Sequence, residues 1–479
     1  MADNKVKKGF ATYLLVLLLI IVAAFLIVIV VMLFSPFQNI LGFQYLTYND
    51  YFYVGNTATS DVINFADIEE INITCENAQV KVERSMEASN DSIRFENYCK
   101  GFAHAGDNTA FNYDIYFANE EKTILNVEVE EPEGFLFFDN RVIVSVIVPA
   151  DSTYSLEDTA INISNTSGTV TIGNQTRLTD DESVSGIRNT LDLNSFSVRT
   201  ISGNVILYSF IDSTFDDVYV RTESGSVTMH IDDYNVNDKI EFHTTSGNFN
   251  LNNINYQGEE NVQENIVFNV GNGNFYVDSV SGNVSLGIES GYLSIDNLNG
   301  NLTAIDSVRQ MDTAQIYIDN MDGDLNLPFA NASSITIGTL NQGNLVFISG
   351  TSGNVNIGQM DGYADIETTS GNVSVTNLSD DMDITTTSGN IEVSYDSDVT
   401  NSVLNFKSDT GRIDVRIRSG FKCVAEFLNS SGERDNSRVD IQFYIPDFTN
   451  PLLINVNSEQ DEGSLMYITT DSDVTLSLI

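Results

Sequence analysis

The side chains that could do chemistry in this sequence are mostly carboxylates. Two carboxyl groups at a suitable separation can cleave a glycosidic bond, one as the acid and the other as base or nucleophile. Adjacent carboxylates occur at turn-like places that include Asp216-Asp217, Asp232-Asp233, Glu259-Glu260 and Asp380-Asp381. Because turns lie at the surface, we interpret these doublets as solvated charges. We therefore expect no catalytic residues, and a polysaccharide-cleaving β-helix enzyme is the less favoured alternative.

Histidine and cysteine are too scarce to build a metal or nucleophile site. The histidines lie in unrelated sequence contexts: His104, His230 and His243. Neither a metal triad nor a Ser/His/Asp set therefore has support. Three cysteines form at most one disulfide, which cannot hold 479 residues together. Cys75 and Cys99 could pair across adjacent strands; the alternative is that these thiols and Cys423 are free and partly buried.

The charge is strongly one-sided, with 22 Lys and Arg against 67 Asp and Glu and a formal net charge of −45. Such a chain repels phosphates, which excludes nucleic acid as a partner and disfavours anionic lipid headgroups. Metal cations, basic peptides and neutral glycans stay open as ligands. We expect no cofactor and no metal centre, although calcium could find hard oxygen ligands at an acidic corner such as Asp322-Gly323-Asp324.

One group of cations recurs at a fixed position. Arg199, Arg221 and His243 lie 22 residues apart, each directly before a threonine. If the three stack on an outer face, they form a positive strip that could hold an anionic sugar or a carboxylate. The alternative, which we favour, is that nearby acids such as Glu223 and Glu241 neutralise them. This column is nevertheless the candidate ligand-facing site.

The fixed spacing comes from a repeat that dominates residues 165–415. The unit is Ser-Gly-Asn or a close variant, followed by apolar, polar and apolar residues. Copies begin at Ser202, Ser224, Ser246, Ser281, Ser352, Ser370 and Ser388. We expect the glycine to adopt positive φ and the asparagine to tolerate the left-handed region, so that each copy forms a tight corner. The alternation that follows predicts a short strand, with Val373 and Val375 toward a core and Ser374 on the opposite face.

Strands this short cannot bury an apolar face alone, so successive units must stack. Coils of roughly 18 to 22 residues, stacked about 4.8 Å apart, would bury a continuous apolar column. The sequence therefore predicts an all-β fold, a parallel β-solenoid of about twelve coils, preceded by one transmembrane α-helix. Antiparallel hairpins in a sandwich are the alternative, but they would not align Thr200, Thr222 and Thr244 in one column.

The helix is expected close to the N-terminus. An apolar series without charge or proline runs from Leu14 to Phe34, and at about 1.5 Å per residue it spans roughly the thickness of a bilayer core. Three lysines precede it within the first eight residues. This bias predicts a single-pass protein of the cell membrane, with a cytoplasmic N-terminus and an extracellular C-terminal domain. A cleaved signal peptide, the alternative, would have a shorter apolar region and a small-residue cleavage site.

The arrangement of strands and repeats resembles a known family. A strand pair from Ile68 to Val82, a strand ending in Val148-Pro149 and the serial Ser-Gly-Asn units are similar to the bacterial putative-adhesin domain, a family of unknown function built as a β-solenoid. The resemblance covers most of residues 61–420. It implies a surface adhesin of a bacterial envelope, and it supplies no catalytic residues.

These patterns divide the chain into six segments. They are a cytoplasmic N-terminus (1–10), a transmembrane helix (11–35), a juxtamembrane linker (36–60), the strand-rich start of the adhesin-like domain (61–160), the solenoid repeats (161–420) and C-terminal capping strands (421–479). The whole predicts a membrane-anchored cell-surface protein that binds or displays an extracellular glycan or protein ligand without catalysis. The alternative is a structural or regulatory envelope protein that recruits a partner near the membrane.

Overall fold

The structure is a computed structural model of the chain. It describes residues 15–26, short strand segments between residues 39 and 59, and most of residues 63–478. Within 63–478 the residues outside this description are 105–111, 131–137, 151–155, 176–190, 192, 209–213, 231–232, 258–264, 306–311, 329–330, 332, 379, 396–400, 444–451 and 455–462.

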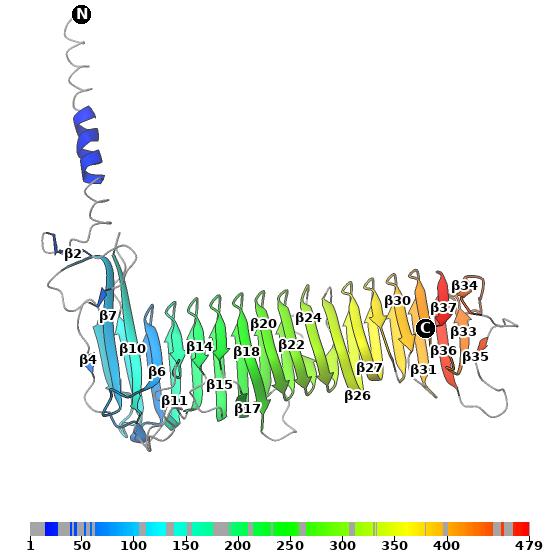
Figure 1. Cartoon of the computed structure of the whole chain (residues 1–479), viewed down its shortest axis with the longest axis horizontal. Helices are drawn as coiled ribbons and strands as arrows, with labels where there is room; N and C mark the ends of the chain where they lie inside the picture. The colour runs from blue at the N-terminus through cyan, green and yellow to red at the C-terminus, as the bar shows by residue number, and fades with distance from the viewer. Residues whose placement is uncertain are drawn as a thin grey trace, which may run out of the picture.

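Most of the chain forms one long rod of stacked coils, with the strands lying across the rod axis (Figure 1). Each coil contributes a strand to each of two columns. The first column contains, in spatial order, β9(Ile124–Glu130), β5(Glu70–Cys75), β11(Leu156–Asn165), β13(Leu193–Thr200), β15(Thr214–Thr222), β17(Asp233–Thr244), β19(Ile266–Val270), β21(Val284–Ile288), β23(Leu302–Ala304), β25(Leu325–Leu327), β26(Ser334–Gly350), β27(Val355–Thr368), β29(Met382–Thr386), β31(Val403–Ser408), β36(Ser464–Thr470) and β33(Cys423–Leu428).

The second column shares β26 and β27, which are long enough to run through both columns. Its other strands are, in spatial order, β10(Phe138–Pro149), β6(Gln79–Ser85), β12(Val170–Ile172), β14(Val205–Tyr208), β16(Val227–His230), β18(Phe249–Tyr256), β20(Asn274–Ser281), β22(Tyr292–Asn299), β24(Gln315–Asp322), β28(Val373–Val375), β30(Ile391–Tyr395), β32(Ile413–Ile417), β37(Val474–Leu478) and β34(Val439–Ile441). Pairing within both columns is parallel. The fold is therefore mostly β, and its long open sheet is consistent with the predicted solenoid rather than with an antiparallel sandwich.

Antiparallel pairs occur at the two ends of the rod. At the N-terminal end β7(Ser92–His104) pairs with β10, and β8(Asn112–Phe117) pairs with β9. The remaining elements there are β1(Asn39–Ile40), β2(Phe43–Tyr45), β3(Phe52–Tyr53), β4(Ala58–Thr59) and the 3-10 helix η1(Phe65–Asp67). At the other end β35(Leu452–Ile454) pairs with β33.

Alternate side chains of both columns fill the interior. Val373 and Val375 are buried and Ser374 is partly exposed, as the alternation predicts. Near mid-rod, aromatic rings stack from coil to coil, and the centroids of Phe249 and Phe275 lie 4.5 Å apart. Each large apolar side chain removed from water contributes about 1.5–3 kcal/mol. The coils are thus held by one shared core.

The corner glycines have a steric role that differs from the expected one. The prediction of positive φ is wrong for all the corner copies except Gly282. A Cβ on Gly225 would instead lie 1.9 Å from the carbonyl oxygen of Gly203, one coil earlier. Equivalent clashes, at 1.5–2.1 Å, occur at Gly203, Gly247, Gly353, Gly371, Gly389 and Gly411. Glycine is required because the backbones of successive coils approach too closely for any side chain.

Hydrogen bonds explain the residues around the glycine. The buried hydroxyl of Thr222 accepts a hydrogen bond from the backbone N–H of Gly225 at 2.7 Å, and the same bond recurs at most other corners. The asparagine bonds along the rod, because Asn372 Oδ1 accepts a hydrogen bond from the backbone N–H of Asn390 at 2.9 Å. Asparagine is therefore present as a link between coils and not for a left-handed backbone.

The carboxy-terminal end is assembled out of sequence order. β36 pairs with β31 on one side and β33 on the other, and β37 pairs with β32 and β34. The last coil of the chain therefore lies between two coils that precede it, as the red strands in Figure 1 show.

An α-helix covers residues 15–26, inside the apolar series from Leu14 to Phe34. Among the described residues, no helix has both the length and the apolar character needed to cross a bilayer. Residues 11–14 and 27–35 of the predicted transmembrane segment lie outside the described residues.

The cysteines lie far apart in the pairing scheme. Cys75 is buried on β5, which pairs with β9 and β11, whereas Cys99 is on β7, which pairs with β10. The adjacent-strand arrangement proposed for these two residues is thus not found in the described part, and the Cys99 side chain lies outside it. Burial raises the pKa of the Cys423 thiol to about 12, so this thiol is unreactive at neutral pH.

Replacing Gly225 by alanine tests the steric role of the corner. The added Cβ must push two coils apart, so we expect a loss of about 1–3 kcal/mol and a lower melting temperature. The control is Gly287→Ala, where the nearest atom to the new Cβ is Ile305 Cδ1 at 3.3 Å, at the end of a flexible side chain. Equal melting temperatures for the two variants would contradict this explanation.

Candidate functional site

The predicted cationic column is a row across three neighbouring strands. The register of β13, β15 and β17 places Arg199 beside Arg221 and Arg221 beside His243. Each alternates with buried neighbours, so the row lies on the outer face, with both arginines exposed and His243 half-buried. The structure therefore brings the three residues together, and their role as ligand contacts stays a prediction.

Aromatic and acidic side chains share this face. The guanidinium of Arg199 lies over the ring of Tyr219, 5.1 Å from its centroid, and the His243 ring lies 5.3 Å from the same tyrosine. His243 Nε2 is 3.0 Å from Glu241 Oε2. An acid thus pairs with one end of the row, as the favoured alternative requires. Neither arginine pairs with a carboxylate of any residue that the structure describes, Glu223 included.

The row borders a shallow polar groove made of two adjoining hollows. The first, of about 500 Å³, is lined by Asn72, Ile73, Thr74, Asn126, Glu128, Asn162, Ile163, Ser164, Ser197 and Arg199. The second, of about 330 Å³, is lined by Asn162, Ser195, Phe196, Ser197, Arg199, Asp217, Val218, Tyr219, Lys239 and Glu241. Shared walls at Asn162, Ser197 and Arg199 make the two hollows one continuous groove across successive coils.

A chain of amides forms the floor at one end of the groove. Asn162 donates a hydrogen bond to Asn72 Oδ1 at 3.1 Å, and Asn72 donates to Asn126 Oδ1 at 3.0 Å. Asn162 also donates to Glu70 Oε1 at 2.8 Å. These bonds fix which face of each amide carries the oxygen, so the amides present donors and acceptors in a set order.

At the other end of the groove, the pKa values of Asp217 and Glu241 are shifted in opposite directions. Burial raises the pKa of Asp217, and the nearby Asp238 and Asp216 raise it further. Burial also acts to raise the pKa of Glu241, but hydrogen bonds from Lys239 and His243 outweigh it and leave the pKa below its ordinary value. The groove thus combines an ionised acid, guanidinium and amide donors, and one aromatic face, which suits a polar ligand.

Other candidates from the sequence lie apart from this groove. Asp381 Oδ1 accepts a hydrogen bond from the backbone N–H of Val403 at 2.7 Å, which makes this carboxylate structural. The ring of His230 stacks on Tyr208, with centroids 5.4 Å apart. Outside the described residues lie Asp232, Glu259 and Glu260 and the side chains of His104 and Asp233.

The described part of the chain contains no cluster of side chains that would bind a metal ion. No group of three or more His, Cys, Asp or Glu there could hold a metal ion. The acidic corner Asp322-Gly323-Asp324 has both carboxylates exposed. Two exposed carboxylates are fewer than the six to eight oxygen ligands that calcium takes, so water would have to supply the rest.

Comparison with known proteins identifies the carboxy-terminal part of the rod. Residues 263–477 match the family model described as Toastrack DUF4097. This part of the chain is similar to that family. The resemblance predicted from the serial repeats is thereby confirmed. The candidate groove precedes the matched Toastrack segment in the chain, so the family match does not extend to its residues.

Two solved structures are similar to this chain. A putative adhesin from Bacteroides fragilis aligns with 63% of this chain and 96% of its own, at 12% identity and a TM-score of 0.27. A putative cell adhesion protein from Clostridium sporogenes aligns with 88% of this chain and 99% of its own, at 6% identity and a TM-score of 0.19. No curated protein matches the chain.

Replacing Glu241 by glutamine tests the network at the groove. Because the pKa of Glu241 lies below its ordinary value of 4.5, its ionised form contributes stability that is fully present above that value and is lost as the pH falls through the folded-state pKa. We expect Glu241→Gln to melt below the wild type at about pH 7 and the difference to shrink toward about pH 3. Glu223→Gln, an exposed control, should change little at either pH. A difference that does not vary with pH would contradict the network.

Proposed function

We propose that the chain is a membrane-anchored cell-surface protein whose rod binds an extracellular ligand and catalyses no reaction. The observation that carries the proposal is the polar groove across the outer face, with Arg199 laid over Tyr219 between its two hollows. The groove is open and shallow and crosses several coils, which suits a stretch of an extended polymer better than an enclosed small molecule.

The groups in the groove favour a glycan that carries carboxylates. Tyr219 offers a flat ring for stacking against a sugar, and the oriented amides of Asn72 and Asn162 suit hydroxyl groups. Arg199 and Arg221 have no carboxylate partner among the described residues, and a guanidinium binds a carboxylate through two parallel hydrogen bonds. An acidic sugar would supply the carboxylate that these two arginines lack within the described part of the chain.

A binding role fits the state of the carboxyl groups better than hydrolysis does. Glycoside cleavage needs one carboxyl group as acid and another free to act as base or nucleophile. Here both oxygens of Glu241 are engaged, one by Lys239 and the other by His243. The function we propose is therefore recognition.

Attachment to the membrane is the second part of the proposal. It rests on the apolar series from Leu14 to Phe34, the lysines that precede it and the helix over residues 15–26. Figure 1 places this helix at the β7 end of the rod. An anchor there would place the membrane next to the β7 end of the rod.

Charge reversal at the two arginines tests the binding role. The probe is an oligosaccharide of uronic acids, with a neutral oligosaccharide of the same length beside it. We expect Arg199→Glu with Arg221→Glu to weaken uronate binding by about tenfold or more, because attraction becomes repulsion, and to leave neutral-sugar binding nearly unchanged. Lys407→Glu with Arg438→Glu, two exposed cations elsewhere, is the matched control. An equal loss in the control, or no uronate binding by the wild type, would count against the proposal.

Cell fractionation and proteolysis test the anchor. The full chain should sediment with membranes, and protease added to intact cells should digest the rod. Removing residues 1–35 should release the rod from the membrane fraction, because no apolar segment remains to hold it. A full chain found in the cytosol, protected from the protease, would refute anchoring.

An envelope protein that recruits a partner near the membrane is the alternative. Crosslinking on living cells separates the two roles, since an adhesin captures molecules from outside and a regulator captures its own envelope neighbours. Exclusive capture of envelope proteins would favour the alternative.

A further inference from the structure

A second hollow lies on the other column of the rod, across the start of the segment that matches the Toastrack family model. It has a volume of about 630 Å³ and spans β18, β20 and β22. Its walls are Asn248, Phe249, Asn250, Asn274, Tyr276, Val277, Asp278, Ser294 and Asp296. Tyr276 is 45% exposed.

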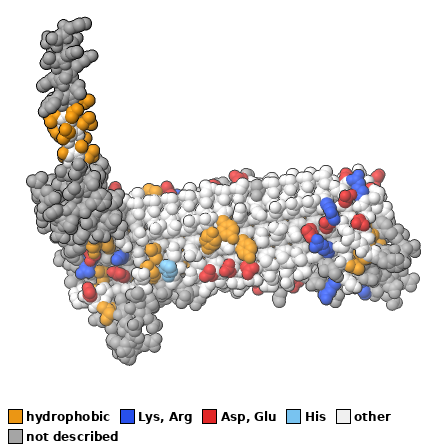
Figure 2. Space-filling model, turned by 45° about the horizontal axis from the view of Figure 1, so that its top comes forward, with side chains coloured by type: hydrophobic (Ala, Val, Ile, Leu, Met, Phe, Trp, Pro, Cys, Tyr) orange, Lys and Arg blue, Asp and Glu red, His pale blue; other side chains and the backbone are white. Residues whose placement is uncertain are grey.

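Three tyrosines gather here on the outward face. The rings of Tyr276 and Tyr292 lie 5.5 Å apart, and the register places Ser294 between Tyr276 and Tyr317 on consecutive strands. The tyrosines therefore occupy neighbouring outward positions on three successive coils. In Figure 2 a group of orange side chains lies about half-way along the rod, beside a row of red ones.

A row of carboxylates runs alongside the tyrosines. Asp278, Asp296 and Asp319 each lie two residues after a member of the neighbouring row, so they share its outward face, and all three are exposed. None of the three pairs with a Lys or Arg within the described residues. The surrounding sequence offers little neutralisation, since residues 244–406 contain 20 Asp and Glu and a single cation, Arg309.

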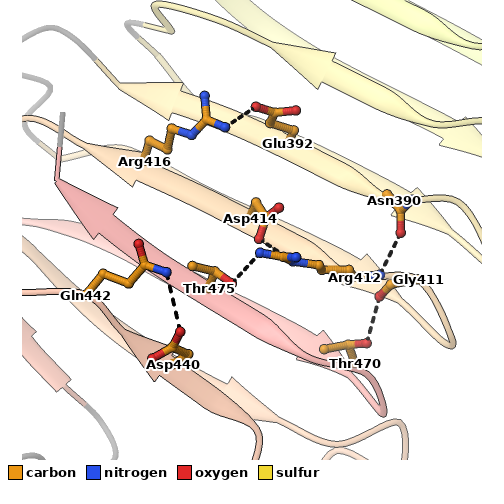
Figure 3. Close-up of polar contacts among 10 residues, drawn as sticks. All are labelled: Asn390, Glu392, Gly411, Arg412, Asp414, Arg416, Asp440, Gln442, Thr470 and Thr475. Atoms are coloured by element: carbon orange, nitrogen blue, oxygen red, sulfur yellow. Dashed lines mark hydrogen bonds and ion pairs between the residues drawn. The ribbon is translucent and has the colours of Figure 1, made fainter.

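Farther along the rod, the outward row that holds Tyr276 and Tyr317 carries acids that the chain neutralises itself. The pairing register carries Tyr317 through Thr336, Asn356 and Ser374 to the acids Glu392 and Asp414. There Glu392 pairs with Arg416 at 2.6 Å, and Asp414 pairs with Arg412 at 2.7 Å (Figure 3). The chain thus covers these two acids with its own guanidinium groups and leaves Asp278, Asp296 and Asp319, in the adjacent row at mid-rod, uncovered.

The chain also shows how a guanidinium suits a tyrosine on such a face. Arg199 lies over Tyr219, on the next coil, at 5.1 Å from the ring centroid. A guanidinium placed between the two mid-rod rows would meet a tyrosine face and a carboxylate together. Arginine is therefore the side chain that this surface fits best.

We propose that the strip formed by Tyr276, Tyr292, Tyr317, Asp278, Asp296 and Asp319 binds an extended, arginine-rich segment of a protein partner. The strands beneath are paired on both sides, so the partner binds through side chains and not by adding a strand. Alternate side chains of an extended peptide point the same way, so an Arg-x-Arg-x sequence presents a line of guanidinium groups to the strip.

Peptide binding to the full chain in detergent micelles tests this proposal. The probe is a fluorescent octapeptide of alternating Arg and Ser, followed by fluorescence anisotropy, with Lys-Ser and Glu-Ser octapeptides beside it. We expect the Arg peptide to bind, the Lys peptide to bind more weakly and the Glu peptide not to bind. Asp278→Asn with Asp296→Asn and Asp319→Asn should weaken binding of the Arg peptide by about tenfold and reduce its dependence on salt.

Tyrosine variants separate stacking from simple charge attraction. Tyr276→Ala with Tyr292→Ala should weaken binding of the Arg peptide by about fivefold and remove its advantage over the Lys peptide. The matched control for the aspartates is Glu76→Gln with Glu367→Gln and Asp473→Asn, which removes three exposed carboxylates elsewhere on the rod and should leave binding unchanged. An equal loss in that control would overturn the proposal, because the attraction would then be general.

Two further outcomes would also overturn it. An oligomer of glucosamine that displaces the Arg peptide and binds more tightly would assign the strip to an amine-bearing glycan. Concentration-dependent dimerisation of the wild type, lost in the triple aspartate variant, would assign it to a second copy of the chain. The uronate test at Arg199 and Arg221 is independent, since these arginines lie on β13 and β15 of the first column and the strip lies on β20, β22 and β24 of the second.

Discussion

The close approach of one coil's backbone to the next at the glycine corners is the constraint on which the rest of the rod depends. At Gly225 the space that a Cβ would occupy is filled by a carbonyl oxygen of the preceding coil. This contact brings each coil into register with its neighbour. Thr222 fixes the shape of the corner within its own coil, and the corner asparagines bond one coil to the next. A bulkier corner would separate the coils beyond the strand spacing of about 4.8 Å and break the ladders on both sides.

Because the coils stack in a fixed register, the spacing of residues in the sequence determines which of them are neighbours on the surface. The inward positions are committed to the core and the corners to stacking, so the outward positions are where side chains can vary without harm to the fold. Residues at equivalent places in successive coils become neighbours, which is how Arg199, Arg221 and His243 form one row although they lie 22 residues apart. The function of such a rod is accordingly carried by rows of outward side chains and the shallow grooves between them.

This geometry determines which features of the fold and of the groove can be predicted from the sequence. Where coils have constant length, as around Arg199 and Arg221, spacing alone gives the row, and the parallel stacking and the alternating core follow from the same pattern. Spacing does not reveal the amide chain, because its coils have irregular lengths: Asn72 lies 54 residues from Asn126 and 90 from Asn162. The insertion of β36 and β37 between earlier coils has no local signal, since any coil with an apolar face could occupy that place. The sequence does not distinguish a glycine needed for positive φ from one needed for close backbone contact, because a tight turn and a close contact both select glycine.

Stacking in register also imposes an electrostatic cost that shapes where a ligand can bind. Like charges at equivalent positions are brought to neighbouring strands, and Asp365 lies directly beside Asp383. Burial raises the pKa of Asp365, and the charges of Asp383 and Glu367 raise it further, so its ionised form lowers stability as the pH rises through that pKa. An acidic rod can lower this cost with its own arginines, as at Glu392 and Asp414, or by leaving its acids exposed to water. Exposed acids that lie beside tyrosine faces and have no internal cation are then the places where an external cation gains most from binding. The same reasoning applied to the arginines beside Tyr219 makes them the place where an external anion gains most, so one rod offers two sites of opposite charge on separate faces.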